Sequence, residues 1–444
     1  MGRPKKTLKK PKLRVKKKLV EKVKGMHDIL PSEMPYWDLF FDAVDKVTRT
    51  FGFSKFETPI LERTELFQRS TGENTDVVQK EMFSFIDKGG DDLTLRPEGT
   101  PGVVRAYIEN GMHTYPQPVK LYYVGPMFRR EKPQAGRQRE FHQFNIEALG
   151  SSKAVIDAQV IFIAWKILKK IGLNNFEVQI NSVGCRVCRE QYREMLVDFL
   201  TSKKQRLCMD CKKRLKSNPM RVLDCKNPKC QETINEAPQI IDYLCEECHN
   251  HFKEVLEYLD EAKIPYNLNS KLVRGLDYYT KTAFEIWPTG EKAVAAQGSF
   301  GGGGRYDDLV EIMGGRETPA IGMALGVERI INYLKENRER KDLPRKKPDV
   351  MLVQLGDMAR KKSLGIINAL IDSGISVVEN MHKDSIKSQL RFASNLGVRY
   401  ALILGQKEVL DKSILIRDMQ SGIQEVLNQD NLAIEIKKKL SQKN

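Results

Sequence analysis

The sequence contains no long apolar run: no segment approaches the roughly 18 apolar residues that a membrane-spanning helix needs. It also shows no internal repeat of about 20–50 residues, which excludes a solenoid or a propeller. The first residues lack the apolar core of a secretory signal, and they are rich in lysine rather than in the arginine and serine of a mitochondrial presequence. We therefore expect a cytoplasmic protein that does not enter a membrane.

Two common nucleotide-binding signatures are missing as well. No G-x-x-x-x-G-K-[ST] phosphate loop occurs, and the four glycines at Gly301–Gly304 do not fit the pattern G-x-G-x-x-G. A nucleotide bound by this chain would therefore need arginines and a metal ion to hold its phosphates, because a planar guanidinium group can bind two phosphate oxygens at once.

Positive charge, by contrast, is abundant. The 444 residues include 74 Lys or Arg and 58 Asp or Glu, a net charge of +16, which indicates a polyanionic partner. Residues 1–24 contain twelve Lys or Arg against the single acid Glu21, so a net charge of +11 lies in this tail. Such a tail cannot bury enough apolar surface to fold, and we predict a disordered arm that can contact the phosphates of a nucleic acid.

The rest of the chain divides into segments of different character. At roughly 150 residues per domain, the length predicts about three units. Residues 25–150 and 268–333 have mixed strand and helix patterns, and we expect them to form one domain. Residues 335–348 are charged and almost free of apolar side chains, so we predict a linker there.

A separate domain is predicted after the linker, over residues 349–444. Its expected elements are a strand at Val350–Leu355, a helix that ends before Gly374, a strand at Ile375–Val378, a helix that begins at Asp384, and a strand at Tyr400–Leu404. Strands that alternate with helices form a parallel or mixed sheet. The pattern predicts a small α/β domain and does not show its function.

All eight cysteines fall in one part of the chain. They form four close pairs, Cys185 with Cys188, Cys208 with Cys211, Cys225 with Cys230, and Cys245 with Cys248. Disulfides are disfavoured in a reducing compartment, whereas two thiolates at this spacing can bind one tetrahedral Zn²⁺. Eight ligands would make two structural zinc sites, and the pairing of the pairs stays open. The alternative is a set of free cysteines in a small helical insertion.

The most informative stretch runs from Leu121 to Gly150, where two extended segments flank a loop rich in Arg, Lys, Pro and Gly. Alternation along the second segment places Gln143 and Glu147 on one face, together with Phe141 and Asn145. The other face, with His142, Phe144, Ile146 and Ala148, is more apolar. With Arg129, the polar face could form a pocket for a small molecule that has both an ammonium and a carboxylate group. The alternative is a solvated sheet face.

Three further clusters hold residues suited to chemistry. In Leu93–Tyr107, Glu98 lies in a strand-to-helix turn, followed by Gly99 and Thr100. Leu272–Ile286 contains Arg274, Asp277, Tyr278 and Tyr279 near the start of an alternating run. Phe300–Ile330 contains the four glycines and then Arg329 on an otherwise apolar helix, where a guanidinium group needs an anionic or aromatic partner.

Together these segments closely resemble the motifs of the histidyl-tRNA synthetases, a family of class II aminoacyl-tRNA synthetases. The matching segments are GMHDILP at Gly25–Pro31, TLRPEGT at Thr94–Thr100, GPMFRREKPQAGRQREFHQ at Gly125–Gln143, RGLDYYT at Arg274–Thr280, GGGGRYD at Gly301–Asp307 and GVER at Gly326–Arg329. Within the class, RGLDYYT is peculiar to the histidine enzymes. The resemblance extends from about Lys24 to the C-terminus.

The resemblance implies an α+β catalytic core over residues 25–333, built on an antiparallel sheet flanked by helices. The cysteines would lie in an insertion at about 182–265. The domain at 349–444 would bind the anticodon, and its expected α/β type agrees with the pattern above. The resemblance also implies a homodimer.

The resemblance further implies ATP-dependent attachment of L-histidine to histidine tRNA through a histidyl-adenylate. The residues that would bind histidine are Glu98, Gly99, Thr100 and Gln143 around its ammonium group, Glu147 and Tyr279 at its imidazole, and Tyr278 and Tyr306 along the pocket. The residues that would bind ATP are Arg129 at the α-phosphate, Arg274 between that phosphate and the histidine carboxylate, and Arg329 at the triphosphate and adenine. Arg129 and Arg274 would be catalytic, with Mg²⁺ accompanying ATP.

The loop Lys132–Arg139 resembles the part of these enzymes that touches the acceptor end of the tRNA. Lys132, Gln134 and Arg137 are the expected contacts, with Gln134 at the extra guanine of histidine tRNA. Two other classes of function compete with this interpretation. One is a non-catalytic paralogue that serves as a regulatory subunit of ATP phosphoribosyltransferase, and the other is an RNA-binding module without catalysis. Only the synthetase should exchange pyrophosphate into ATP in a histidine-dependent manner.

Overall fold

The computed structural model describes residues 19–72, 75, 77–132, 136–274, 276, 278–290, 298–337, 343 and 347–441. It forms two compact units, Met1–Leu343 and Pro344–Asn444. Of the predicted basic tail, residues 1–18 lie outside the described residues, and residues 19–24 are exposed without helix or strand. Within the described part of the chain, no helix is long and apolar enough to cross a membrane.

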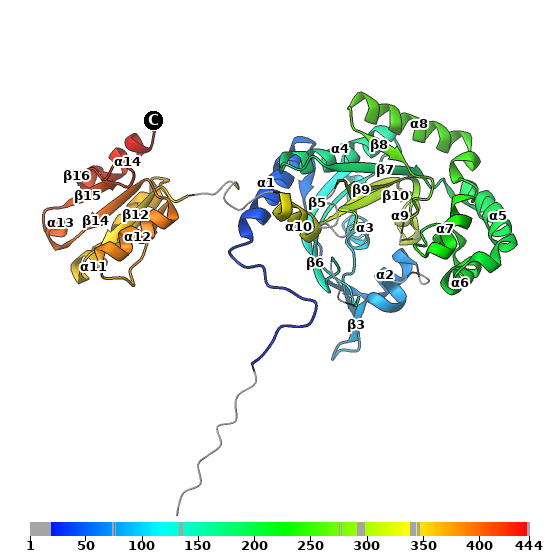
Figure 1. Ribbon diagram of the computed structural model, residues 1–444, viewed down its shortest axis with the longest axis horizontal. Helices are drawn as coiled ribbons and strands as arrows, with labels where there is room; N and C mark the ends of the chain where they lie inside the picture. Colours follow the sequence, from blue (N-terminus) through cyan, green and yellow to red (C-terminus); the bar gives the residue numbers. More distant parts are fainter. Residues whose placement is uncertain are drawn as a thin grey trace, which may run out of the picture. The chain divides into compact units, whose positions relative to one another are not determined.

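An eight-stranded sheet forms the centre of the first unit (Figure 1). In spatial order its strands are β1 (Ser54–Lys55), β5 (Val119–Phe128), β6 (Glu140–Leu149), β11 (Ala320–Gly326), β10 (Gly301–Arg305), β9 (Thr280–Pro288), β7 (Phe176–Ser182) and β8 (Tyr266–Leu268). All pairings are antiparallel except those of the two edge strands, β1 with β5 and β7 with β8. The expected antiparallel core is therefore confirmed.

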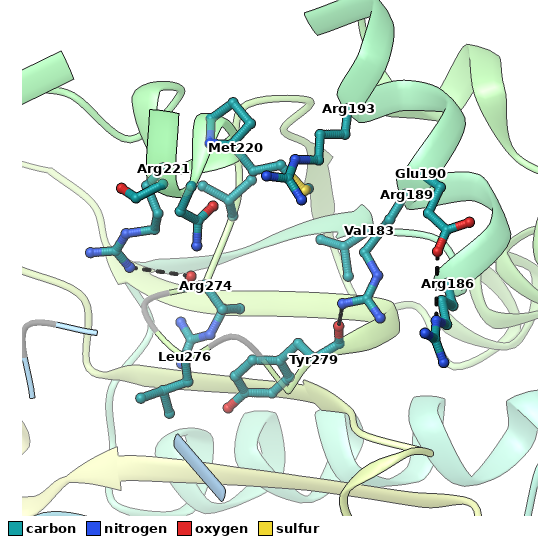
Figure 2. Close-up of a pocket in the computed structure, with 14 residues that line it drawn as sticks. Val183, Arg186, Arg189, Glu190, Arg193, Met220, Arg221, Arg274, Leu276 and Tyr279 are labelled. Atoms are coloured by element: carbon teal, nitrogen blue, oxygen red, sulfur yellow. Dashed lines mark hydrogen bonds and ion pairs between the residues drawn. The ribbon is translucent and has the colours of Figure 1, made fainter. Parts of the chain in front are cut away.

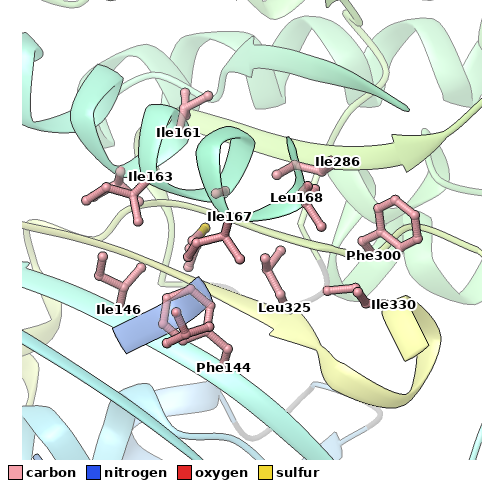
Figure 3. Packing of buried hydrophobic residues seen from close by; sticks show 14 of the residues in the cluster. Phe144, Ile146, Ile161, Ile163, Ile167, Leu168, Ile286, Phe300, Leu325 and Ile330 are labelled. Atoms are coloured by element: carbon pink, nitrogen blue, oxygen red, sulfur yellow. The ribbon is translucent and has the colours of Figure 1, made fainter. Parts of the chain in front are cut away.

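Helices and the sheet enclose an apolar core. The helices that contribute to it are α1 (Met34–Thr50), α4 (Ala154–Lys170), α8 (Glu246–Glu261) and α10 (Val327–Asn337). Phe144 and Ile146 of β6 pack in this core with Ile167 of α4 and Ile330 of α10 (Figure 3). These contacts show that the apolar face of β6 packs in this core, whereas its polar face, on which Asn145 and Glu147 are also buried, lies on the opposite side of the sheet.

A buried ion pair lies within this core. The Asp157 carboxylate of α4 pairs with Arg305 of β10 and accepts hydrogen bonds from His251 Nε2 at 2.9 Å and Thr282 Oγ1 at 2.6 Å. Burial alone would raise the pKa of Asp157, but Arg305 and His251 outweigh it and hold the pKa below its ordinary value. The network joins α4 and α8 to the central strands.

Smaller elements complete the first unit. A three-stranded sheet has the order β2 (Leu61–Arg63), β4 (Asp92–Leu95), β3 (Phe83–Ile86). The shorter helices are α2 (Thr64–Thr71), η1 (Val77–Glu81), α3 (Thr100–Glu109), η2 (Met112–Thr114) and α9 (Leu309–Ile312). Glu98 lies between β4 and α3, so the predicted strand-to-helix turn is present.

The segment between β7 and β8 is helical and contains all eight cysteines. Its elements before α8 are α5 (Arg186–Ser202), η3 (Lys204–Arg206), α6 (Met209–Ser217), η4 (Pro219–Val222), α7 (Pro228–Asn235) and η5 (Ile240–Tyr243). They have an apolar core of their own, in which Tyr192, Leu196 and Val222 are buried. We call this segment the insertion.

The second unit is a five-stranded mixed sheet with helices. Its strands in spatial order are β13 (Val377–Glu379), β12 (Val350–Gln354), β14 (Tyr400–Leu404), β15 (Ser413–Asp418) and β16 (Gln424–Asn428), and its helices are α11 (Asp357–Asp372), α12 (Ile386–Leu396), α13 (Gln406–Leu410), η8 (Gln429–Asn431) and α14 (Leu432–Ser441). The first three strands are parallel and the last two antiparallel. The predicted α/β domain is confirmed as mixed. Within the range predicted as a linker, α10 continues to Asn337 and Leu343 is buried.

Candidate active site

A hollow of about 450 Å³ opens on the polar face of the central sheet. It brings together the four clusters that the sequence analysis selected, because the β5–β6 hairpin, the turn before α3, the segment before β9, and the β10 to α10 region all contribute side chains. The predicted site residues that line it are Glu98, Gly99, Thr100, Arg129, Arg137, Gln143, Arg274, Tyr278, Tyr279 and Arg329. Residues far apart in sequence therefore form one site.

Glu147 and Tyr306 lie in the wall behind this hollow, each only 1% exposed. The Glu147 carboxyl accepts a hydrogen bond from Thr100 Oγ1 at 2.7 Å and another from Tyr306 Oη at 2.6 Å. Burial raises its pKa to about 8, although the two hydrogen bonds oppose the rise. A buried carboxyl of this kind is suited to a ligand that brings N–H donors.

Glycine at position 322 makes room for this carboxyl. Gly322 of β11 lies opposite Glu147 in the sheet, and a Cβ atom there would lie 1.5 Å from Glu147 Oε2. Any other residue at this position would displace the Glu147 side chain. The sheet itself therefore fixes the direction in which Glu147 points.

Glu98 is a second buried carboxyl, and it faces the hollow from the turn before α3. It accepts hydrogen bonds from Thr71 Oγ1 at 2.7 Å and from Tyr278 Oη at 2.8 Å. Burial raises the pKa of Glu98, and these two hydrogen bonds partly oppose the rise. Two buried carboxyl groups with no basic partner in the described part of the chain, Glu98 in the lining and Glu147 behind it, therefore lie at this part of the hollow, an arrangement that favours a ligand with positive or N–H donor groups.

Several buried polar atoms at the site have no hydrogen-bond partner among the described residues. They are the Gln143 Oε1, Asn145 Oδ1, Tyr123 Oη and Arg274 Nε atoms. Leaving such an atom unpaired costs about 1–3 kcal/mol, so a group of them at one hollow favours a site where water, an ion or a ligand completes the hydrogen bonds. A Cβ atom on Gly99 would lie 1.7 Å from Tyr123 Oη, so glycine is required beside them.

Arginines supply the opposite charge on another side of the hollow. Arg129 donates from Nε to the carbonyl oxygen of Pro97 at 2.9 Å, and Arg329 donates from Nη1 to that of Ser299 at 2.8 Å. Burial lowers the pKa of Arg329, and the nearby charges of Arg137 and Arg129 lower it further. Mutually repelling guanidinium groups at one hollow favour an anionic ligand such as a phosphate chain.

Arg274 is held from two directions. It forms an ion pair with Glu285 of β9, and its guanidinium carbon lies 5.4 Å from the centre of the Tyr279 ring. Trp287 Nε1 donates to the other Glu285 oxygen at 2.9 Å. Glu285 therefore orients Arg274, a role that the sequence analysis missed although an acid between the apolar residues Phe284 and Ile286 was a visible signal.

The predicted tRNA contacts and Asp277 are not all found at the hollow. Lys132 is exposed and does not line the hollow, whereas Arg137 lines it and pairs with Glu131 at 2.8 Å. Gln134 and Asp277 lie outside the described residues. Arg221 of the insertion also lines the hollow. No sequence signal connected it with the site, because it lies far from every other site residue along the chain.

The eight cysteines gather in two groups of four. One group contains Cys185, Cys188, Cys245 and Cys248, and the other contains Cys208, Cys211, Cys225 and Cys230. Within each group all Sγ atoms lie within 4.8 Å of one another. A tetrahedral Zn²⁺ with bonds of about 2.3 Å would place its sulfurs about 3.8 Å apart, so the donor set and the spacing both fit this metal.

Comparison with known proteins gives the family. Residues 25–330 match the histidyl-tRNA synthetase family, and residues 349–439 match the family of anticodon binding domains. The chain belongs to the histidyl-tRNA synthetase family. A histidine–tRNA ligase of Desulfitobacterium hafniense is 46% identical over 405 residues, which cover 91% of this chain and 95% of the relative. That of Desulforamulus reducens is 44% identical, with 94% and 99% covered.

Solved structures agree with this family. The apo histidyl-tRNA synthetase of S. aureus is 35% identical to the chain, with a TM-score of 0.78 over 94% of this chain and all of that one. A Bacillus halodurans protein titled as an ATP phosphoribosyltransferase regulatory subunit/histidyl-tRNA synthetase has a TM-score of 0.60 at 20% identity, which shows a shared fold alone. The fold by itself therefore does not separate the two kinds of protein, whereas the full-length matches to histidine–tRNA ligases favour the synthetase.

Proposed function

We propose that the chain activates L-histidine with ATP and transfers the histidyl group to histidine tRNA. The observation that carries the proposal is Glu147, a carboxyl buried in the wall of an arginine-lined hollow. Membership in the histidyl-tRNA synthetase family and the anticodon-binding domain support the same function. A regulatory subunit or an RNA-binding module would not need arginines for a triphosphate beside a buried carboxyl.

Histidine would bind with its imidazole at Glu147 and Tyr279. The Glu147 carboxyl can accept hydrogen bonds from the imidazole N–H groups. An apolar amino acid would leave this carboxyl buried without an N–H partner, at a cost of roughly several kcal/mol in binding free energy. The ammonium group would lie near Glu98, Thr100 and Gln143. The unpaired Gln143 Oε1 atom supports this placement because it is an acceptor without a donor.

Adenylate formation would depend on position and charge rather than on a side-chain nucleophile. The histidine carboxylate attacks the α-phosphate of ATP and diphosphate leaves, so no enzyme group is modified. Arg129 and Arg274 would neutralise the charge that develops at this phosphate, and Arg329 would bind the triphosphate and the adenine. The Glu131 and Glu285 carboxylates at the hollow are ligands of the type that Mg²⁺ prefers, and the ion would supply further neutralisation of phosphate charge when it is bound with ATP.

In the second step a ribose hydroxyl at the end of the tRNA takes the histidyl group and AMP is released. Lys132, Gln134 and Arg137 would contact the acceptor end, and residues 349–444 would bind the anticodon. A lysine at position 132 supplies charge to a phosphate without the paired hydrogen bonds of an arginine. We also expect a homodimer in the cytoplasm, and sedimentation at about twice the chain mass of 50.9 kDa would support the dimer.

We further propose that each group of four cysteines binds one structural Zn²⁺. Backbone N–H groups donate to the sulfurs, from Cys245 to Cys188 Sγ at 3.1 Å and from Cys208 to Cys230 Sγ at 3.2 Å. Such bonds stabilise thiolates around a metal. Closed four-sulfur sites hold structure and do no chemistry.

Pyrophosphate exchange tests the proposed function. The purified protein should incorporate labelled pyrophosphate into ATP when histidine is present, and Arg274→Ala should abolish this exchange without loss of the fold. Exchange that does not depend on histidine, or none from a folded wild-type protein, would refute the proposal. A regulatory subunit and an RNA-binding module both predict no histidine-dependent pyrophosphate exchange.

A further inference from the structure

The insertion contacts the active-site segment at two points. This segment runs from Arg274 to Tyr279, of which Arg274, Leu276, Tyr278 and Tyr279 are described. Arg221 of η4 donates from Nη1 to the carbonyl oxygen of Arg274 at 3.3 Å, and Arg189 of α5 donates from Nη1 to that of Tyr279 at 2.9 Å. Figure 2 shows the two arginines reaching opposite ends of the segment.

Packing around the cysteine group of Cys208, Cys211, Cys225 and Cys230 fixes the backbone that carries Arg221. The next two residues, Val222 and Leu223, are buried in the apolar core of the insertion together with Cys211, Cys225 and Cys230. Arg221 itself is directed away from that core into the active-site hollow. Its position therefore depends on elements that do not otherwise belong to the site.

Arg189 is anchored in a comparable way. It follows Cys188 directly, near the start of α5, and Cys188 belongs to the group that joins the beginnings of α5 and α8. Its guanidinium also approaches Asp308 at 3.6 Å. Arg189 therefore connects the base of the insertion to the residue that we propose to contact the imidazole.

The backbone at this base is also tied to β9. Val183 N donates to the Lys281 carbonyl at 2.7 Å, and Lys281 N donates to the Gly184 carbonyl at 2.9 Å. Lys281 has a φ of +46°, which is unfavourable for a residue with a side chain. Its ion pair with Glu247 of α8, at 2.8 Å, helps to hold it in that conformation.

We propose that Arg189 and Arg221 are positioning residues that hold the two ends of the Arg274–Tyr279 segment, so that the insertion sets the geometry of the active site. The inference rests on the proposed function for the roles of Arg274 and Tyr279. Arg221 fixes the backbone from which the Arg274 guanidinium would reach the α-phosphate, and so acts on the chemical step. Arg189 fixes Tyr279 and so acts on histidine affinity.

Methionine variants separate these two effects in histidine-dependent pyrophosphate exchange. Methionine retains much of the apolar stem of arginine and removes its N–H donors. R221M should lower kcat about tenfold with little change in the KM for histidine, and R189M should raise that KM about tenfold with little change in kcat. R193M is the control, because Arg193 lies on the same helix as Arg189 and makes no hydrogen bond or ion pair with the described residues of the segment, and because tRNA is absent from the assay. Equal losses of kcat/KM in all three variants, or no loss of kcat/KM in R189M and R221M, would overturn the proposal.

Hydrogen exchange supplies a readout that does not depend on activity. The amides of Leu276, Tyr278 and Tyr279 should exchange faster in R221M and R189M than in wild type and R193M, without substrates present. Lysine can donate one N–H to the same carbonyl, so R221K should recover most of the lost kcat. Unchanged hydrogen exchange of these amides would overturn the proposal, and so would a folded R221K whose kcat is no higher than that of R221M. The failure of wild-type pyrophosphate exchange would instead refute the proposed function alone.

Discussion

Glu147 is held away from water between Thr100 and Tyr306, and no Lys or Arg pairs with it among the residues that the structure describes. An imidazole N–H would satisfy the carboxylate directly. Glu147→Gln cannot become a carboxylate when the imidazole binds and offers the ring only an amide as a weaker acceptor, so we expect the KM for histidine in pyrophosphate exchange to rise about 10- to 100-fold. Glu254→Gln, on the exposed side of α8, is the control and should not change it. An unchanged KM in Glu147→Gln would contradict the assignment.

The raised pKa of Glu147 also predicts a pH dependence of stability. In the unfolded chain this carboxyl loses its proton near pH 4.5, whereas the folded protein retains it up to about pH 8. The unfolded state therefore binds fewer protons between these values, and the contribution of Glu147 to the free energy of unfolding falls as pH rises from about 4.5 to 8. Glu147→Gln cannot ionise, so its stability relative to wild type should increase over that range. Urea unfolding at several pH values tests this, and a constant difference would contradict the buried, protonated state.

Two glycines make a matched pair for testing the packing around Glu147. Gly322→Ala places a Cβ atom against Glu147 Oε2 and against the Ile146 carbonyl, and we expect a loss of about 1–3 kcal/mol together with weaker histidine binding. Gly365 lies in α11 with nothing near its would-be Cβ, so Gly365→Ala should stabilise the protein by up to about 1 kcal/mol. Thermal unfolding measures the stability of the two variants, and titration with histidine measures their affinity for the amino acid. Equal effects of the two substitutions would show that the glycine is not needed for the carboxyl.

Sequence alone predicted the site residues that alternation or motif placed together. Gln143 and Glu147 were predicted because a strand sends its alternate side chains to one face, and the apolar residues between them marked the face that packs in the core. Glu285 and Arg221 were missed for a different reason. Arg274 itself was predicted, but its contacts with Glu285 of β9 and Arg221 of the insertion follow from tertiary packing rather than from a motif.

Among the elements, the insertion is the one whose stability should depend on a metal. The protein as purified should contain about two Zn²⁺ per chain, and Cys211→Ser should retain about one. Removal of zinc by a strong chelator should unfold the insertion, seen as a loss of helical circular dichroism, because metal binding and folding are coupled in small four-cysteine sites. Less than one zinc per chain, with helix content unaffected by chelation, would contradict this prediction.

Element boundaries were predictable where alternation was regular. In the second unit Tyr400–Leu404 is a strand over the predicted range, and the strand expected at Val350–Leu355 ends one residue earlier. The helix expected from Asp384 begins at Ile386. The arrangement of the insertion was not predictable, because the choice among cysteine pairings depends on how α5 to α8 pack. The structure groups the outermost two pairs together and the inner two together.

At the scale of the whole molecule, the positive charge of residues 1–24 predicts a salt effect. Each phosphate contact that forms on tRNA binding releases counterions, so affinity falls with salt in proportion to the number of contacts. A chain shortened to begin near Lys24 should bind histidine tRNA with a shallower dependence of log Kd on log salt concentration than the full chain. Identical slopes would mean that the tail contacts no phosphates.

The most direct measurement is the distance between the bound amino acid and Glu147 in a crystal structure with histidine and an unreactive ATP analogue. We expect an imidazole nitrogen within about 2.7–3.2 Å of the Glu147 carboxyl, with the histidine carboxylate facing the α-phosphate between Arg129 and Arg274. An imidazole bound elsewhere, or a hollow that takes neither molecule at saturating concentration, would contradict this expectation.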